Sequence, residues 1–201
     1  MAKEKCITLK STAIPLPIEN IDTDQIIPAR FLKATTREGF GENLFCDWRY
    51  DNEGKPKPDF VMNNPKYSGK ILVAGKNFGC GSSREHAAWA IYDANLRVVI
   101  SSFFADIFKN NALNNALLPI TVSEDFLKKI FDTIEKNPKT ELTVDLQNQK
   151  VILEDGSSES FDINAYKKTC LTNGYDDIDY LISLKEDITK FDKTHASVSV
   201  G

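Results

Sequence analysis

The stretch between residues 71 and 100 constrains the fold of this chain most, because it reads as strand, glycine-rich turn, helix and strand in succession. The apolar run Ile71–Ala74 is typical of a buried strand, and the run 97–100 is a second one. The residues between them predict a helix over about 83–94, after a turn that contains three glycines. Such a βαβ unit is normally right-handed with parallel strands, so the chain is predicted to be an α/β protein.

The turn itself, residues 75–86, has the features of an anion-binding site. Ser82 and Glu85 stand in the S-x-x-E relation of a capping box, which predicts that Ser82 caps the helix, with Ser83 as the alternative. Backbone N–H groups at the start of a helix lie at the positive end of its dipole. Arg84 adds a planar donor that suits a carboxylate or a phosphate.

A glycine-rich connection of this kind can also be a simple tight turn with a good cap. Two known phosphate-binding loops do not fit its spacing. A Walker loop needs a lysine after its last glycine, where this chain has Ser82. A dinucleotide fingerprint needs a small residue where this chain has Arg84. The pattern that remains suits a carboxylate ligand at least as well as a phosphate.

Composition excludes several classes of protein. With 201 residues, 41% of them hydrophobic and 27% charged, the chain has the make-up of a globular protein, and a single domain over residues 1–201 is expected. A formal net charge of −4 gives no support for nucleic-acid binding. No run approaches the roughly 18 apolar residues of a membrane span, and the first residues lack the apolar region of a secretory signal. We therefore expect a cytoplasmic protein with neither a nucleic-acid nor a membrane partner.

The cysteines and histidines give little support for a metal site in this chain. The cysteines include no C-x₂-C pair, from which structural zinc and iron–sulfur sites commonly draw ligands. They are scattered at Cys6, Cys46, Cys80 and Cys170. His195 lies in a polar tail, and His86 lies in the first turn of the predicted helix, where a structural role is favoured over a catalytic one. No metal ligand is therefore expected here.

The remainder of the chain predicts a mixed sheet flanked by helices. Residues 30–64 form a long loop, and its aromatic residues favour an ordered lid or contact surface over a wandering surface excursion. The other expected elements are a short helix starting within 101–108, a strand over 117–122, a Ser123-capped helix over 124–136, a hairpin over 142–153, an Asp162-capped helix ending at Asn173, and a C-terminal helical tail over 176–201.

Several segments together resemble a known family. Residues 79–86, Gly-Cys-Gly-Ser-Ser-Arg-Glu-His, closely resemble the G-x-G-S-S-R-E-H signature of the mobile swivelling domain of the aconitase superfamily. Residues 20–28 resemble the signature near the start of that domain, and residues 102–108 and 115–120 match its later segments in order. The insert at 37–49 looks like that of the bacterial small subunits of 3-isopropylmalate dehydratase. The resemblance covers nearly the whole chain.

The resemblance implies a fold and a reaction. The fold is a swivelling β/β/α domain of the aconitase type. Family members dehydrate a hydroxy acid to an alkene and rehydrate it with the hydroxyl on the neighbouring carbon, which here implies interconversion of 2- and 3-isopropylmalate in leucine biosynthesis. A 4Fe-4S cluster with one open iron acts as a Lewis acid on the departing hydroxyl, and its ligands are cysteines of a large subunit. We therefore expect a hydro-lyase subunit that is active only with its large-subunit partner, on a small dicarboxylate hydroxy acid.

By the same resemblance, Ser82 is the catalytic residue, removing a proton as an alkoxide. A serine needs strong activation for this role, which Arg84 and the N–H groups at the helix start could supply. Ser83 and Arg84 would hold one substrate carboxylate. Arg30 and Arg37 are the candidates for the other, and a surface ion pair is an equally open alternative for each of them.

Substrate choice in the family is attributed to the segment that is here 30–34. Phe31 and Leu32 are apolar and suit an isopropyl group, whereas Lys33 could serve a substrate with an extra carboxylate. A homoaconitase-like or citramalate-type hydro-lyase subunit therefore stays open as an alternative.

Two further classes of function stay open at this point. A non-catalytic module could use the turn only to hold a small carboxylate. A metal-free hydrolase could use Ser82 with His86, but that spacing gives poor geometry and the chain has no G-x-S-x-G elbow at this turn.

Overall fold

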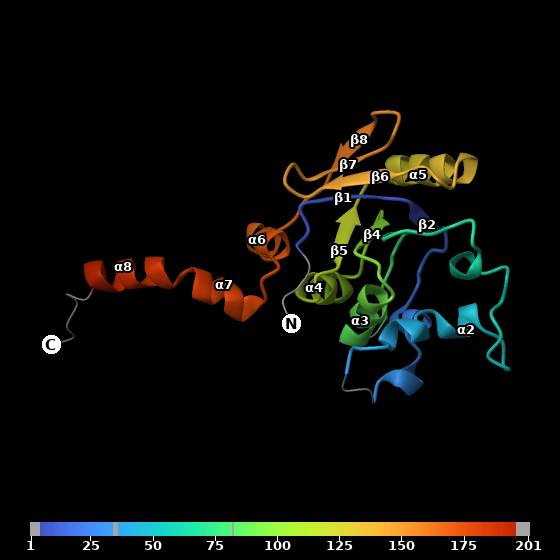
Figure 1. Cartoon of the computed structure of the whole chain (residues 1–201), viewed down its shortest axis with the longest axis horizontal. Coiled ribbons are helices and arrows are strands. Elements are labelled where there is room, and N and C mark those ends of the chain that lie inside the picture. Colours follow the sequence, from blue (N-terminus) through green and yellow to red (C-terminus); the bar gives the residue numbers. More distant parts are fainter. Residues whose placement is uncertain (1–4, 34–35, 82, 196–201) are drawn as a thin grey trace.

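The computed structural model describes residues 5–33, 36–81 and 83–195. A parallel sheet in the order β2-β3-β4-β5 consists of Ala13–Leu16, Ile71–Ala74, Val98–Ser101 and Leu118–Thr121. An antiparallel sheet in the order β1-β6-β7-β8 consists of Thr8–Ser11, Leu142–Asp145, Lys150–Ile152 and Ser158–Ser160. The α/β class is confirmed, with the parallel and antiparallel pairings in two separate sheets (Figure 1).

Helices surround the parallel sheet. The α-helices are α1 (Thr23–Ile26), α2 (Cys46–Arg49), α3 (Glu85–Asp93), α4 (Asp106–Asn114), α5 (Glu124–Lys136), α6 (Ala165–Asn173), α7 (Asp177–Ser183) and α8 (Lys185–His195). The 3-10 helices are η1 (Ala29–Phe31), η2 (Phe40–Asn43) and η3 (Val61–Asn63). None of the helices in the described part of the chain is long and apolar enough to cross a membrane.

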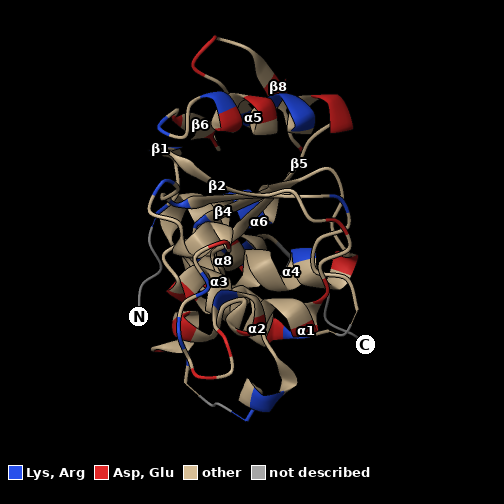
Figure 2. Cartoon of the chain, turned by 90° about the vertical axis from the view of Figure 1, so that its right-hand side faces the viewer, with Lys and Arg blue, Asp and Glu red and all other residues tan. Residues whose placement is uncertain are grey.

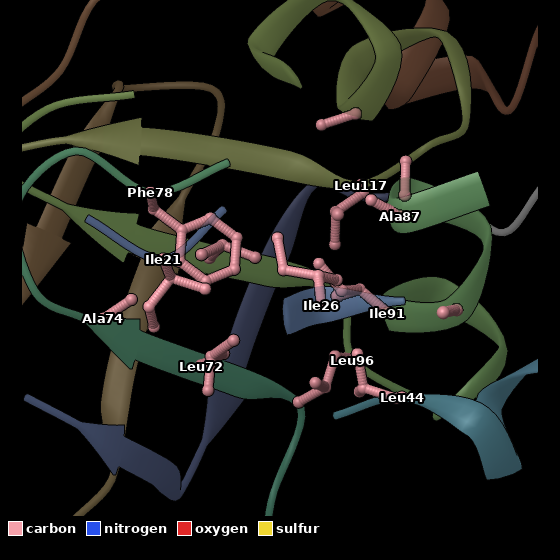
Figure 3. Packing of buried hydrophobic residues seen from close by; sticks show 14 of the residues in the cluster. Ile21, Ile26, Leu44, Leu72, Ala74, Phe78, Ala87, Ile91, Leu96 and Leu117 are labelled. Carbon is pink, nitrogen blue, oxygen red and sulfur yellow. The ribbon is translucent and has the colours of Figure 1, made fainter. Parts of the chain in front are cut away.

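The parallel sheet is buried on both faces, and the alternation along β3 shows how. Leu72 and Ala74 point to a core shared with α1, α3, α4 and the insert, part of which Figure 3 shows. Ile71 and Val73 point to a second core, shared with α5 and the antiparallel sheet. Because neighbouring residues of a strand face opposite sides, one apolar run supplies both cores. The result is a layered β/β/α arrangement, with α5 and the antiparallel sheet on one side of the parallel sheet and α1 to α4 on the other (Figure 2).

The segment 30–64, predicted as a long loop, is held in place by its aromatic residues. Phe45 is fully buried, and its ring stacks on that of Trp48 with the centroids 5.5 Å apart. Phe60 packs against both rings. The helical turns η2, α2 and η3 lie within this segment. The apolar side chains of this segment therefore belong to the first core or pack against it, whereas residues 51–59 are exposed.

One predicted helix cap needs correction. The helix expected to start within residues 101–108 does so, at Asp106, after Phe104 makes an isolated parallel bridge to Phe78 beside the glycine turn. Helix α6 is capped by Asn164, whose side chain accepts the N–H groups of Tyr166 and Lys167, so the predicted Asp162 cap is wrong. The Ser123 cap of α5 and the hairpin of β6 and β7 are confirmed.

The C-terminal tail is helical, as predicted, over its described part. Helices α7 and α8 extend away from the sheets (Figure 1). The ring of Tyr180 packs edge-on against that of Tyr166 in α6, with the centroids 4.5 Å apart, and this contact anchors the base of the tail. Residues 196–201 lie outside the described part of the chain.

Candidate active site

Two motifs far apart in the chain, residues 20–28 and the glycine turn at residues 75–86, lie side by side at the carboxyl ends of β2 and β3. The N–H of Asn20 donates to the carbonyl of Lys76 (2.8 Å), and the N–H of Gly79 donates to that of Ile21 (2.7 Å). The N–H of Thr23 donates to the carbonyl of Cys80 (2.9 Å). Ligands of open α/β sheets bind in the crevice at this end of the strands. The backbone contacts therefore build one candidate site from two motifs.

The backbone of the glycine turn adopts left-handed φ angles, and at Gly79 it also lies too close to a neighbour to allow a side chain. Asn77, Gly79 and Gly81 have φ angles of 62°, 76° and 89°, in the left-handed region. A Cβ atom on Gly79 would lie 2.2 Å from Cγ of Phe108, so this glycine is required both by its φ angle and by close packing against α4. The side chain of Asn77 donates to that of Asn20 (2.9 Å), which ties the turn to the first motif again.

The start of α3 differs from the predicted capping box. The helix begins at Glu85, with Arg84 as its N-cap and no side-chain cap hydrogen bond. The alternative predicted cap, Ser83, is therefore wrong. Glu85 is the first helical residue instead of the third, and its carboxylate accepts hydrogen bonds from Trp89 and from Asn115. Ser82 itself lies outside the described residues, and Ser83 is exposed directly before Arg84.

Arg84 is held by a carboxylate that the sequence did not point to. Its guanidinium forms an ion pair with Asp24, and the Arg84 side chain is only 16% exposed whereas that of Asp24 is 53% exposed. Asp24 lies in the first turn of α1, whose capping box joins Asp22 and Gln25. The D-x-x-Q pattern could have revealed this helix. Nothing local in the sequence indicates that its partner lies 60 residues further on.

Arg37, predicted for the second substrate carboxylate, lies against helix α3. Its Nη2 is 3.6 Å from Oε1 of Glu85, and its guanidinium carbon is 4.8 Å from the ring centroid of Trp89. The side chain is 54% exposed. The structure thus brings Arg37 next to the residue that follows Arg84 in the chain.

Arg30, the other candidate, is engaged elsewhere. Its guanidinium forms two hydrogen bonds with the Asp47 carboxylate, and its Nη2 is 3.5 Å from the sulfur of Cys46. The hydrogen bond from Arg30 is the main cause that lowers the pKa of Asp47. These three side chains line an open cavity of about 680 Å³ within the segment 30–64. Of the two arginines, Arg37 has the looser carboxylate contact.

The predicted specificity residues lie on η1, immediately after the first motif. Phe31 packs against the first core and under the guanidinium of Arg30, 4.7 Å from its ring centroid. Leu32 caps η1 and is half-buried, whereas Lys33 is exposed. Residue 34 lies outside the described part of the chain.

His86 belongs to an aromatic group at the first turn of α3. Its ring centroid is 4.5 Å from that of Trp89 and 5.7 Å from that of Phe40. This packing agrees with the structural role that the sequence favours for His86.

The described residues do not fit a 4Fe-4S cluster. They contain no group of three or more His, Cys, Asp or Glu side chains that could hold a metal ion. None of the four cysteines, all within the described residues, forms a disulfide, and they lie on separate parts of the fold, with Cys46 in α2, Cys80 in the glycine turn and Cys170 in α6. Burial is the main cause that raises the pKa of the Cys80 thiol, which keeps it protonated beside the site.

Comparison with known proteins gives consistent likenesses. The family described as "Aconitase C-terminal domain" matches residues 3–125, and the one described as "LeuD_N" matches residues 128–165. The 3-isopropylmalate dehydratase small subunit of Cytophaga hutchinsonii is 68% identical over 98% of this chain and 98% of that protein. That of Christiangramia forsetii is 64% identical over 94% and 93%. The crystal structure of 3-isopropylmalate dehydratase (leuD) from Methanocaldococcus jannaschii is similar with a TM-score of 0.66 and 27% identity, over 92% of this chain and 99% of that one.

The carboxylate of Glu85 predicts a pH dependence of stability. The hydrogen bond from Asn115 is the main cause that lowers its pKa below the ordinary value of 4.5, with smaller effects from Trp89 and Arg37. A pKa that is lower in the folded state stabilises the fold above the unfolded value, and this stabilisation disappears as the pH falls through the folded value. Glu85→Gln should therefore make stability less sensitive to pH below 4.5.

Urea unfolding between about pH 6 and about pH 3.5 measures this effect. Glu135→Gln, at an exposed position of α5, is the control and should behave like the unsubstituted chain. An equal loss of stability with falling pH in Glu85→Gln and the unsubstituted chain would contradict the assignment.

Proposed function

Because this chain belongs to the family of 3-isopropylmalate dehydratase small subunits, we propose that it joins a large subunit to complete a hydro-lyase of leucine biosynthesis. This enzyme interconverts 2-isopropylmalate and 3-isopropylmalate by removing and re-adding water. The observation that carries the proposal is the convergence of residues 20–28 and 75–86, which pairs Arg84 with Asp24 at the start of α3, directly after Ser83.

In the proposed site, two arginines recognise the two carboxylates of the substrate. Arg84 and Ser83 bind one carboxylate, and the planar guanidinium suits a bidentate contact. Arg37 binds the other, because its contact with Glu85 is long and its side chain is half exposed. Arg30 stays a weaker candidate, since both of its terminal nitrogens contact Asp47. Two fixed cations at the ends of a dicarboxylate would orient the carbons between them.

Ser82 moves the proton in this proposal. As an alkoxide, it takes a proton from the substrate carbon next to the one that loses the hydroxyl, and it returns a proton when water is added back. The positive end of α3 and the guanidinium of Arg84 would stabilise its negative charge. Arg84 could serve both purposes, because it immediately precedes the helix.

The large subunit is proposed to hold the 4Fe-4S cluster, which supplies the Lewis acid for the departing hydroxyl when it is bound. The cysteines of this chain do not fit it, which supports a site divided between two subunits. A cytoplasmic location is proposed from the residue composition and from the biosynthetic role.

The purified chain should have no activity by itself. An anaerobic assay with 3-isopropylmalate would compare the chain alone, a cluster-loaded large subunit alone, and their mixture. Turnover is expected only in the mixture, because the base and the Lewis acid come from different chains. Turnover by the chain alone would refute the division of the site.

Substitutions in the turn test the assigned roles. Ser82→Ala should lower kcat by about 10²- to 10⁴-fold, the usual effect of losing an acid–base group. Arg84→Lys should also be severe, since lysine cannot reproduce a bidentate contact. Ser83→Ala is the matched control at the neighbouring hydroxyl and should be milder. Near-normal turnover in Ser82→Ala with none in Ser83→Ala would reverse the two roles.

The segment after the first motif is proposed to set substrate preference. The three carbons of an isopropyl group, at about 0.8 kcal/mol each, provide about 2 kcal/mol, or roughly thirtyfold discrimination. Leu32→Arg should lower kcat/KM for 3-isopropylmalate relative to homoaconitate, whereas the volume-conserving Leu32→Met should preserve the ranking. An unchanged ranking in Leu32→Arg would place the specificity elsewhere.

A further inference from the structure

We infer that Glu85 is a positioning residue, whose carboxylate and the ring of Trp89 together hold Arg37 in the orientation that substrate binding requires. This inference rests on the proposed function, in which Arg37 binds the second substrate carboxylate. It assigns a role to Glu85, a residue of the glycine-turn motif that takes part neither in the proposed proton transfer nor in the contact between Arg84 and Asp24.

Glu85 receives three cationic or N–H groups on one carboxylate oxygen. Its Oε1 accepts from Nδ2 of Asn115 at 3.0 Å and from the indole Nε1 of Trp89 at 3.2 Å, and it lies 3.6 Å from Nη2 of Arg37. Asn115 is 3% exposed, and its Nδ2 also donates to the carbonyl of Asn111 (2.8 Å). The buried amide therefore fixes the carboxylate from the side of the core, and the arginine meets it from the side of the solvent.

Trp89 contacts both charged partners. One helical turn after Glu85, it donates its indole N–H to the carboxylate. Its ring lies 4.8 Å from the guanidinium carbon of Arg37, within the range of a cation–π contact. The carboxylate and the ring thus restrict the guanidinium in two directions while leaving the side chain 54% exposed.

The backbone that carries Arg37 is fixed on the same helix. Phe40 packs on Trp89 with a centroid distance of 6.3 Å, and the N–H of Gly41 donates to Oδ2 of Asp93 at 2.7 Å. A Cβ atom on Gly41 would lie 2.4 Å from the backbone nitrogen of Ala94, so the insert approaches the end of α3 as closely as a glycine allows. The N–H of Phe40 donates to the carbonyl of Arg37 (3.2 Å), which links Arg37 to this anchored backbone, and Glu85 and Trp89 restrict its side chain.

The length of the contact suits positioning better than stabilisation of the fold. An exposed ion pair of this kind contributes little to stability, and it leaves most of the guanidinium N–H donors of Arg37 available for a substrate carboxylate while Glu85 stays in contact. The stack on Trp89 adds a second restraint. The arginine is therefore restrained before the substrate arrives, which reduces the side-chain entropy lost on binding.

The competing explanation is that Glu85 only stabilises the start of α3 through the helix dipole. Glu85→Gln separates the two, because a glutamine oxygen can still accept from Asn115 and Trp89 but no longer attracts Arg37 electrostatically. The matched control is Glu124→Gln. Glu124 is also the first residue of a helix, α5, and is also paired with a cation, Lys76.

The experiment is a double-substitution cycle in the complex reconstituted with its large subunit, with kcat and KM measured for 3-isopropylmalate. Arg37→Gln should raise KM by roughly tenfold or more, because it removes a hydrogen bond between charged groups. Glu85→Gln should raise KM by up to about fivefold with little change in kcat, whereas Glu124→Gln should change neither. The double variant should be no worse than Arg37→Gln, because Glu85 acts through Arg37.

Each other result has a separate meaning. If Arg37→Gln raises KM but Glu85→Gln does not, or if the two effects add fully, the positioning role is wrong while the proposed role of Arg37 stands. If Arg37→Gln leaves KM unchanged, the role of Arg37 fails, and the inference about Glu85 fails with it. Trp89→Phe keeps an aromatic ring but removes the donor to Glu85. It should raise KM by less than Arg37→Gln with little change in kcat, and an unchanged KM would contradict the positioning role. This variant decides the question if Glu85→Gln does not fold.

Discussion

The site depends on the backbone hydrogen bonds that join the loop after β2 to the turn after β3. Donors and acceptors of residues 20–23 pair with those of residues 76–80, and Asp22 and Cys80 form an isolated parallel bridge. The two loops follow adjacent parallel strands, so they emerge at the same edge of the sheet. Gly79 makes this pairing possible, because any side chain there would collide with Phe108. This backbone pairing brings Asp24 and Arg84 close enough to form their ion pair.

Helix α3 then organises the other half of the site. Its start presents Arg84, its first turn holds Glu85 and Trp89, and its end binds the insert through Asp93. The insert therefore lies along the helix. Arg37 contacts Glu85, the residue that follows Arg84 in the chain. A single short helix therefore fixes both arginines of the proposed substrate site, although they come from segments far apart in sequence.

The sequence predicted what is encoded locally. The β3–turn–α3–β4 unit, the Ser123 cap and the family itself are confirmed, because each depends on a few neighbouring residues or on an ordered set of motifs. Contacts between distant residues were not predictable in this way. The start of α3 differs from the prediction because Glu85 is its first residue, and its carboxylate accepts a hydrogen bond from Asn115, 30 residues later. The pairing of Arg30 with Asp47 likewise leaves no local signal in the sequence.

The proposed site also solves an electrostatic problem. A dicarboxylate site needs two cations close together, and such a pair would repel and remain heavily hydrated if nothing balanced it. Here each arginine has a protein carboxylate of its own, Asp24 for Arg84 and Glu85 for Arg37. The two pairs differ, since the Arg84 side chain is largely buried and that of Arg37 is half exposed. In the proposed site, Arg84 therefore acts as the fixed reference for the proton transfer at Ser82, and Arg37, oriented by Glu85 and Trp89, binds the other substrate carboxylate through its exposed side.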